Sequence, residues 1–209
     1  MKTLHYLIIL VSFTAFTGCD KEETKKSTEP AGWFLSGSIP REFKIGVDNQ
    51  NTKQGLKSGF IESTTDTLNG FGTMMQNCSE KDFKGKRVKM TGYIQLLGSA
   101  YTYALMWVRV DDFEKRVAAD FDNMADRPIV GTHYWTKCEI VFDVPESPCV
   151  VNYGIVLDGV GKAWFDSVSF DTVSYSTFKT AYYLNEPFID EYQIWQDLPE
   201  SPVNLDFEE

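Results

Sequence analysis

The sequence predicts an all-β fold, an antiparallel β-sandwich, on three observations. Residues 56–171 contain short runs rich in valine, isoleucine and aromatic residues, turn-forming clusters separate these runs, and no long helical period crosses them. The clearest runs are VKMTGYIQL, YALMWVRVDD, KCEIVFDVP, VVNYGIVLDG and AWFDSVSFDTV. Several short strands at this spacing are typical of two packed antiparallel sheets.

The breaks between the runs have the chemistry of turns. Pro145 and Pro148 bracket one break, and Gly159 with Gly161 permits a tight turn at another. Beyond residue 173 the pattern is less regular, with aromatic residues among acids. We expect this part to wrap over the core, with one or two helical turns around 189–195.

Residues 1–18 have the pattern of a secretion signal. Lys2 gives a positive start, residues 4–16 are mostly apolar, and the small residues Thr17 and Gly18 stand directly before Cys19. The apolar part is too short to span a membrane comfortably. The sequence therefore predicts export from the cytoplasm.

The segment Phe-Thr-Gly-Cys at 16–19 resembles the lipobox of bacterial lipoproteins, although Phe16 stands where that family usually has leucine. In that family the signal is cut before the cysteine, which is then acylated on its thiol and its new amino group. The resemblance implies that Cys19 carries a lipid anchor, and two or three acyl chains hold a protein firmly at about 0.8 kcal/mol per buried methylene. The alternative is an ordinary signal peptide with an incidental cysteine.

Residues 19–31 are polar and charged and end near a proline, so we expect a disordered tether. Lys21, Glu22 and Glu23 resemble the surface-export signal of lipoproteins in some Gram-negative bacteria. We therefore expect a protein of the cell envelope that is anchored to the outer membrane and exposed on its outer face. A solvated spacer is the alternative for these charges.

Charge and cysteine content exclude some partners and sites. Without residues 1–18, which hold one basic and no acidic residue, the chain carries 19 basic and 30 acidic residues, a net charge of −11. This balance repels phosphate backbones and argues against a nucleic-acid partner.

Cys78, Cys138 and Cys149 allow one disulfide, but the spacing does not identify the pair. With no CxxC motif and only His133 beyond residue 18, a zinc site of the usual kind is not expected.

Six segments over roughly residues 32–171 carry a further resemblance. They are, in order, GWFLSGSIPREFKIGVD, GLKSGFIES, GFGTMMQ, FDNMADRPIVGTHYW, FDVPE and GKAWFDSVSF. This order resembles a small bacterial domain that stands alone or beside AraC-type helix-turn-helix regulators and looks like a galactose-binding-type jelly roll, the sandwich of many carbohydrate-binding modules. The resemblance implies a jelly-roll domain over residues 32–209. A regulator's role is not expected, because the sequence is acidic and shows no basic recognition helix.

The end of the chain matches the usual beginning of such modules. Their first strand resembles Asn-x-x-Phe-Glu and is followed closely by Gly-Trp, whereas here Gly32 and Trp33 open the domain and residues 204–208, NLDFE, close it. Leu205 and Phe207 alternate with polar neighbours, as in a half-buried strand. We therefore expect a permuted C-terminal strand. The alternative is a fraying acidic tail.

The resemblance also implies a structural calcium ion. In related modules an aspartate within a Trp-Phe-Asp-x-Val pattern often binds calcium; Asp166 matches that position, and Glu208 matches the glutamate of the first-strand pattern. Calcium takes six or more oxygen ligands. The alternative is that Asp166 caps a turn or accepts hydrogen bonds from backbone amides. No other cofactor is expected.

Two segments supply the residues of a candidate ligand site. Alternation in ALMWVRV places Trp107 and Arg109 on one face of a strand, and FDNMADRP adds Asp122, Asn123 and Arg127. A sugar ring needs an aromatic plate for its C–H face and fixed donors and acceptors for its hydroxyls. We expect Arg109 to lie near Asp122 in this site. The alternatives are that Trp107 belongs to the core and that Asp122 and Arg127 form a buried pair.

Catalytic motifs are missing from the sequence: it has no Gly-x-Ser-x-Gly elbow, phosphate loop or metal-binding histidine pair. Carboxylates are abundant in any acidic protein and do not identify a glycosidase. We therefore expect a non-catalytic, lipid-anchored, exported module that binds a saccharide or a similar polar ligand. The alternative is a structural lipoprotein that packs against another envelope protein and has no small-molecule site.

Overall fold

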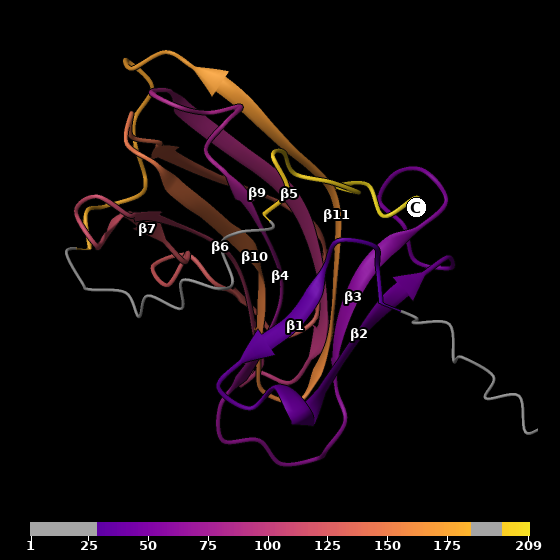
Figure 1. The fold of residues 1–209 in the computed structure, drawn as a ribbon. Helices are drawn as coiled ribbons and strands as arrows, with labels where there is room; N and C mark the ends of the chain where they lie inside the picture. The colour runs from indigo at the N-terminus through magenta and orange to yellow at the C-terminus, as the bar shows by residue number, and fades with distance from the viewer. Residues whose placement is uncertain (1–28, 185–197) are drawn as a thin grey trace, which may run out of the picture.

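A computed structural model describes residues 29–184 and 198–209, and these form two antiparallel sheets packed face to face (Figure 1). The strands are β1 (Phe34–Gly37), β2 (Phe43–Asp48), β3 (Ser58–Ser63), β4 (Phe71–Ser79), β5 (Arg87–Gly98), β6 (Tyr103–Asp112), β7 (Val117–Asp122), β8 (Ile129–Val130), β9 (His133–Asp143), β10 (Cys149–Asp158) and β11 (Gly161–Val173), with a 3₁₀ turn, η1, at Pro40–Glu42. One sheet has the order β1-β4-β10-β6-β7, with β8 also paired to β6, and the other has the order β2-β3-β11-β5-β9. The predicted all-β antiparallel sandwich is confirmed.

The core lies between the sheets and follows from side-chain alternation. On β6, Met106, Val108 and Val110 are fully buried, and the strand places the residues between them on the opposite face. The central strand β10 is buried on both faces over most of its length, and it contributes Tyr153 and Ile155 to the core. The large apolar surface enclosed in this way stabilises the pairing of strands distant in sequence.

The end of the chain enters the core, but not as a strand. Phe207 is fully buried and its ring stacks on Trp33 at 5.0 Å between centroids, while the Trp33 indole donates to the Asn204 carbonyl at 3.0 Å. The backbone φ values of Asn204 and Phe207 are 46° and 60°, so the segment turns instead of extending. Gly59 makes room, because an added Cβ there would collide with the Phe207 ring. The predicted permuted strand is therefore corrected to a turn that places one aromatic ring in the core.

The segment after β11 wraps along the edges of both sheets up to residue 183. Thr180 and Ala181 donate their backbone N–H groups to the Val141 carbonyl on β9, and Tyr182 forms an antiparallel bridge with Phe121 on β7. The predicted helical turns around 189–195 lie outside the described residues. So do residues 1–28, which include the predicted signal, Cys19 and most of the tether. No helix within the described ranges is long and apolar enough to cross a membrane.

The three cysteines of the folded part are free and buried thiols. Burial raises the pKa of Cys78 and of Cys138 to about 12. Burial likewise raises the pKa of Cys149. These side chains therefore act as small apolar groups of the core.

Candidate ligand-binding cleft

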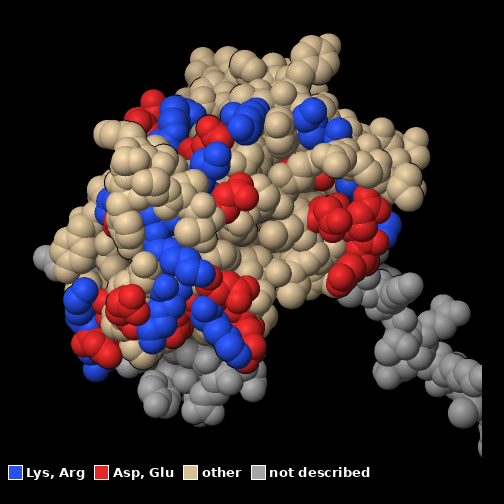
Figure 2. Space-filling model, turned by 90° about the horizontal axis from the view of Figure 1, so that it is seen from above, with Lys and Arg blue, Asp and Glu red and all other residues tan. Residues whose placement is uncertain are grey.

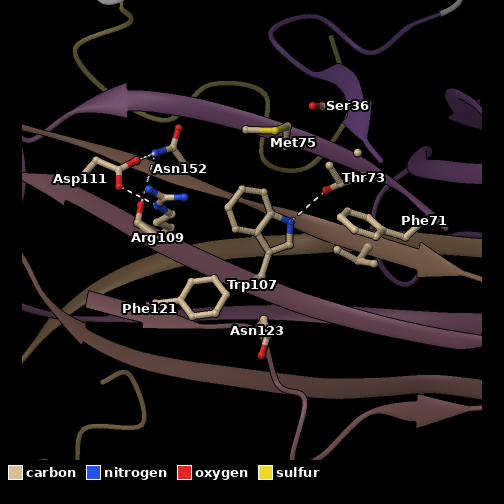
Figure 3. A pocket seen from close by; sticks show the side chains of 12 residues that line it. Ser36, Phe71, Thr73, Met75, Trp107, Arg109, Asp111, Phe121, Asn123 and Asn152 are labelled. Atoms are coloured by element: carbon tan, nitrogen blue, oxygen red, sulfur yellow. Dashed lines mark hydrogen bonds and ion pairs between the residues drawn. The ribbon is translucent and has the colours of Figure 1, made fainter. Parts of the chain in front are cut away.

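A cleft of about 410 Å³ lies on the face of the β1-β4-β10-β6-β7 sheet that points away from the core (Figure 3). Its floor comes from β4, β6 and β10, and residues of β1 and β7 form its walls. We call it the β6 cleft. Its lining residues are Ser36, Gly37, Phe71, Thr73, Met75, Trp107, Arg109, Asp111, Phe121, Asn123, Asn152 and Val156.

Trp107 lies at the centre of the β6 cleft, and a hydrogen bond fixes its indole nitrogen (Figure 3). Its indole Nε1 donates to Thr73 Oγ1 at 2.9 Å, although Thr73 lies on β4 and β10 runs between the two strands. The residue of β10 opposite Trp107 is Gly154, which has no side chain to block this path. Thr73 Oγ1 in turn donates to the Ile155 carbonyl at 3.0 Å. The indole N–H is therefore satisfied, and the half-buried ring offers its face to the cleft.

A charged pair stands beside the indole on the same face of β6. Arg109 Nε donates to Asp111 Oδ1 at 2.6 Å, and Asn152 Nδ2 donates to Asp111 Oδ2 at 3.0 Å. Burial raises the pKa of the Asp111 carboxyl, although the charge and the hydrogen bond of Arg109 oppose this shift. In Figure 3 the guanidinium lies between Asp111 and the Trp107 indole. The hydrogen bond to Asp111 thus fixes the Nε of Arg109, while the terminal nitrogens of Arg109 lie beside the Trp107 ring.

The wall formed by β7 adds an aromatic ring and an amide. Phe121 lies directly across from Arg109 in the β6–β7 register, and its ring meets that of Tyr182 edge to face at 5.8 Å between centroids. Asn123 follows at the end of β7, and its Oδ1 accepts from the Ala125 backbone N–H at 3.2 Å. Its Nδ2 has no partner among the described residues, which leaves a donor at the cleft wall.

Trp107, Arg109 and Asn123 line one cleft, and ligand binding by these residues stays a prediction. The expected contact between Arg109 and Asp122 is wrong. Asp122 pairs with Val108 in the sheet register and is buried on the other face of β7, where its Oδ2 accepts from Arg127 Nη2 at 2.6 Å. Neither member of this pair lines the β6 cleft. The physical reason is the pleat, because consecutive residues of a strand point to opposite faces. The alternative of a pair that fixes the loop is the one observed.

Sequence reasoning missed several residues of the cleft. The alternation of side chains along β7 places Asp122 on the face away from the cleft, and it would have predicted Phe121 as a cleft residue. Asn152 stood out as a polar residue within the apolar run VVNYGIVL, and Asp111 follows Arg109 at the next position on the same face of the strand. Thr73 carried no such signal, because only the pairing of β4 with β10 brings it to Trp107.

Asp166 and Glu208 line a second pocket, between the loop at 53–57 and the bulge of β11. Asp166 Oδ2 accepts from the backbone N–H groups of Lys53 and Gln54 at 2.7 and 3.0 Å. Glu208 Oε1 accepts from those of Leu56 and Lys57 at 2.6 and 3.1 Å.

These N–H donors occupy carboxylate oxygens that a cation would need, and no group of three or more His, Cys, Asp or Glu within residues 29–184 and 198–209 is arranged to hold a metal. The geometry therefore favours the alternative reading, in which the carboxylates pin a loop. Calcium binding by Asp166 and Glu208 stays a prediction.

Surface charge outside the β6 cleft is mixed. On the face seen in Figure 2, Lys and Arg side chains stand among Asp and Glu side chains. Pairs such as Arg87 with Asp143 at 2.7 Å and Lys179 with Asp120 at 2.7 Å neutralise one another. Burial raises the pKa of the Asp120 carboxyl, although Lys179 opposes this shift. The Lys179–Asp120 pair ties the segment after β11 to β7, whereas Arg87 and Asp143 link β5 to β9. The pairs do not form a basic stripe.

Comparison of the sequence with known proteins finds a relative over most of the chain. No family model matches the chain. The chain is 38% identical over 190 residues to a protein of Bacillus subtilis named as an uncharacterized HTH-type transcriptional regulator, YbfP. The match covers 90% of this chain and 60% of that protein, so the chain spans about three fifths of the length of this relative.

Solved structures resemble the sandwich itself. The CBM22-1 xylan-binding domain of Paenibacillus barcinonensis Xyn10C superposes with a TM-score of 0.52 at 19% identity, covering 72% of this chain and 91% of that one. The C-terminal family 22 carbohydrate-binding module of Clostridium thermocellum Xyn10B has a TM-score of 0.51 at 12% identity, covering 71% and 89%. The chain has the fold of these carbohydrate-binding modules. At such identities the likeness concerns the fold alone.

Proposed function

We propose that this protein is a non-catalytic module that binds a saccharide in the β6 cleft. The observation that carries this proposal is the Trp107 ring, which lies on the floor of the cleft with its N–H satisfied by Thr73. A ring fixed in this way contributes a stacking face, which suits the C–H face of a sugar. The volume of the β6 cleft falls within the range usual for small-ligand sites.

Polar groups with unused hydrogen-bonding capacity surround the plate. The terminal nitrogens of Arg109 and the Nδ2 of Asn123 have no partner among the described residues, and the Asn152 Oδ1 accepts from none of them. Phe71 and Phe121 add apolar walls at opposite sides of Trp107, as Figure 3 shows. An aromatic floor with a few fixed donors and acceptors is what hydroxyl-rich rings require.

The solved structures support the same proposal. One of them is described as a xylan-binding domain, and the other is described through the role of conserved amino acids of its cleft in ligand binding. We extend only the class of ligand, a saccharide, to this chain. Regulation of transcription is not proposed, because the chain covers only part of the relative that carries the name and has a net charge of −10.

Binding is tested by affinity electrophoresis in gels that contain xylan, mixed-linkage β-glucan, galactan or mannan. We expect at least one glycan to retard the wild-type protein and the Trp107→Ala variant to migrate as in a gel without glycan. Tyr134→Ala is the matched control, since Tyr134 is 89% exposed on β9 of the other sheet. Equal retardation of the Trp107 variant and the wild type would contradict the proposal. No retardation of the wild type by any glycan would instead favour a structural lipoprotein that packs against another protein.

We also propose that Cys19 is acylated and anchors the domain to the outer membrane, with the domain exposed at the cell surface. The support is the order of charge, apolar segment, small residues and cysteine at residues 2–19, followed by Lys21, Glu22 and Glu23. Cys19→Ser should release the protein into the soluble fraction and abolish metabolic labelling with a fatty acid. Membrane fractionation that persists in the variant would overturn the anchor.

A further inference from the structure

The β6 cleft contains only two charged side chains among its described lining residues, Arg109 and Asp111, and they neutralise each other. Arg109 Nε lies 2.6 Å from Asp111 Oδ1. The Asp111 side chain is only 7% exposed, whereas that of Arg109 is 30% exposed. The acid is therefore withdrawn into the floor of the cleft, and the guanidinium is the member that a ligand meets.

The way in which the two side chains meet determines which donors stay free. Asp111 uses the Nε of the guanidinium, and no described residue accepts from either Nη of Arg109. Asn152 occupies the second carboxylate oxygen at 3.0 Å, so Asp111 is fixed from two sides. The Nη groups form a rigid planar set of donors whose geometry suits either adjacent hydroxyls or a carboxylate.

Electrostatics separates these two ligand types. A sugar acid would bring a second carboxylate to a guanidinium whose charge Asp111 already cancels, in a protein with a net charge of −10. A neutral sugar needs only hydrogen-bond donors, and the Nη groups of Arg109 supply them. Rejection of one ligand by a like charge, with the attractive contacts kept for another, is a common origin of specificity.

We infer that Asp111 is a specificity-determining residue that makes the β6 cleft select uncharged saccharides over sugar acids, by fixing Arg109 through Nε and cancelling its charge. This inference rests on the proposed saccharide-binding function. Asp111 acts through Arg109 and is a positioning residue, while the Nη groups of Arg109 contact the ligand.

The test compares Asp111→Asn with wild type in gels that contain the neutral glycans above or polygalacturonate. We expect the wild type to be retarded by a neutral glycan and not by polygalacturonate. The variant should bind the neutral glycan about tenfold or more weakly, a loss of about 1.4 kcal/mol, and should gain retention by polygalacturonate that added salt removes. Asp171→Asn is the control, since it makes the same change in net charge at an exposed position of β11 in the other sheet. Arg109→Lys should lose neutral binding, because a single ammonium group cannot replace the planar donor set.

A second measurement reads the positioning directly. In ¹⁵N spectra of arginine side chains, the Nε–H signal that disappears in Arg109→Lys should shift in Asp111→Asn and stay in place in Asp171→Asn. An unshifted signal would overturn the pairing.

Two binding outcomes would overturn the inference alone. One is retention of the wild type by polygalacturonate. The other is an unchanged preference in Asp111→Asn while Trp107→Ala still abolishes neutral binding. If no glycan retards the wild type, the proposed function fails and the selectivity with it.

Discussion

The indole of Trp107 and the hydroxyl of Thr73 form a hydrogen bond of 2.9 Å across the intervening strand β10. The Thr73 hydroxyl gives its own proton to the Ile155 carbonyl at 3.0 Å, so it acts as the acceptor for Trp107. A half-buried indole without an acceptor would turn its N–H toward solvent and leave the floor of the cleft. The orientation of the binding plate is therefore set by a residue that does not itself need to contact ligand.

Thr73→Val should test this relationship. The substitution keeps the shape of the side chain and removes the acceptor, so we expect a loss of about 1 kcal/mol in the free energy of unfolding and weaker glycan retention. Urea unfolding and affinity electrophoresis measure the two effects. Thr73→Ser keeps the hydroxyl and should retain binding. Unchanged retention in the valine variant would show that the hydrogen bond does not orient the plate.

Trp107 and Trp33 should respond differently to truncation. Trp33 is 3% exposed and packs against Phe207, so Trp33→Ala should cost about 3–5 kcal/mol of unfolding free energy. Trp107 is half-buried on an outer face, and Trp107→Ala should cost only about 1–2 kcal/mol. Denaturant unfolding of the two variants provides the comparison. An equal loss for both would place Trp107 energetically in the core and remove the main residue of the proposed site.

Asp122 and Asn123 are adjacent in sequence, but substitution of Asp122 should lower stability and substitution of Asn123 should weaken binding. Asp122→Asn weakens the bonds to the Met124 amide and to Arg127, at 2.8 and 2.6 Å, and should lower the free energy of unfolding by about 1–2 kcal/mol without changing glycan retention. Asn123→Ala should reduce retention and leave the stability nearly unchanged. Denaturation curves and affinity gels on the same preparations test both. The reverse pattern would return Asp122 to the ligand site.

Asp48 should make stability depend on pH in the acid range. Burial by itself would raise the pKa of its carboxyl, but hydrogen bonds from the Trp164 indole, the Gln50 amide and Lys162 outweigh burial and lower this pKa to about 2. The unfolded-state pKa is about 3.9. A lowered folded-state pKa gives stability that is present above about pH 4 and is lost as the pH falls toward about 2. Thermal midpoints should therefore fall more steeply over this window in wild type than in Asp48→Asn.

Asp171→Asn serves as the matched control for that measurement, because Asp171 is exposed on β11. Its acid-range slope should follow wild type. If Asp48→Asn also follows wild type, the hydrogen bonds around Asp48 do not contribute a pH-dependent stability.

Several features of the fold could be predicted because they depend on local chemistry. The alternation of β6 placed Trp107 and Arg109 on one face of the strand, since the two-residue period is a property of any extended strand, and that face lines the cleft. The turn residues and the short apolar runs likewise predicted the antiparallel sandwich. The pairing of Arg109 was predicted wrongly because the period was not carried through to β7, where it places Asp122 on the far side.

The sequence by itself determined the fold class, the shared face of Trp107 and Arg109 on one strand and how acidic the chain is. The tertiary structure alone decided that β10 separates β4 from β6, which brings Thr73 to Trp107 and Asn152 to Asp111. It also decided that the end of the chain turns to insert Phe207 beside Trp33 and does not add a strand. The physical reason is that strand order and core packing depend on contacts between residues far apart in the chain. Their free energy comes from burying surface jointly, and no local pattern of residues contains that information.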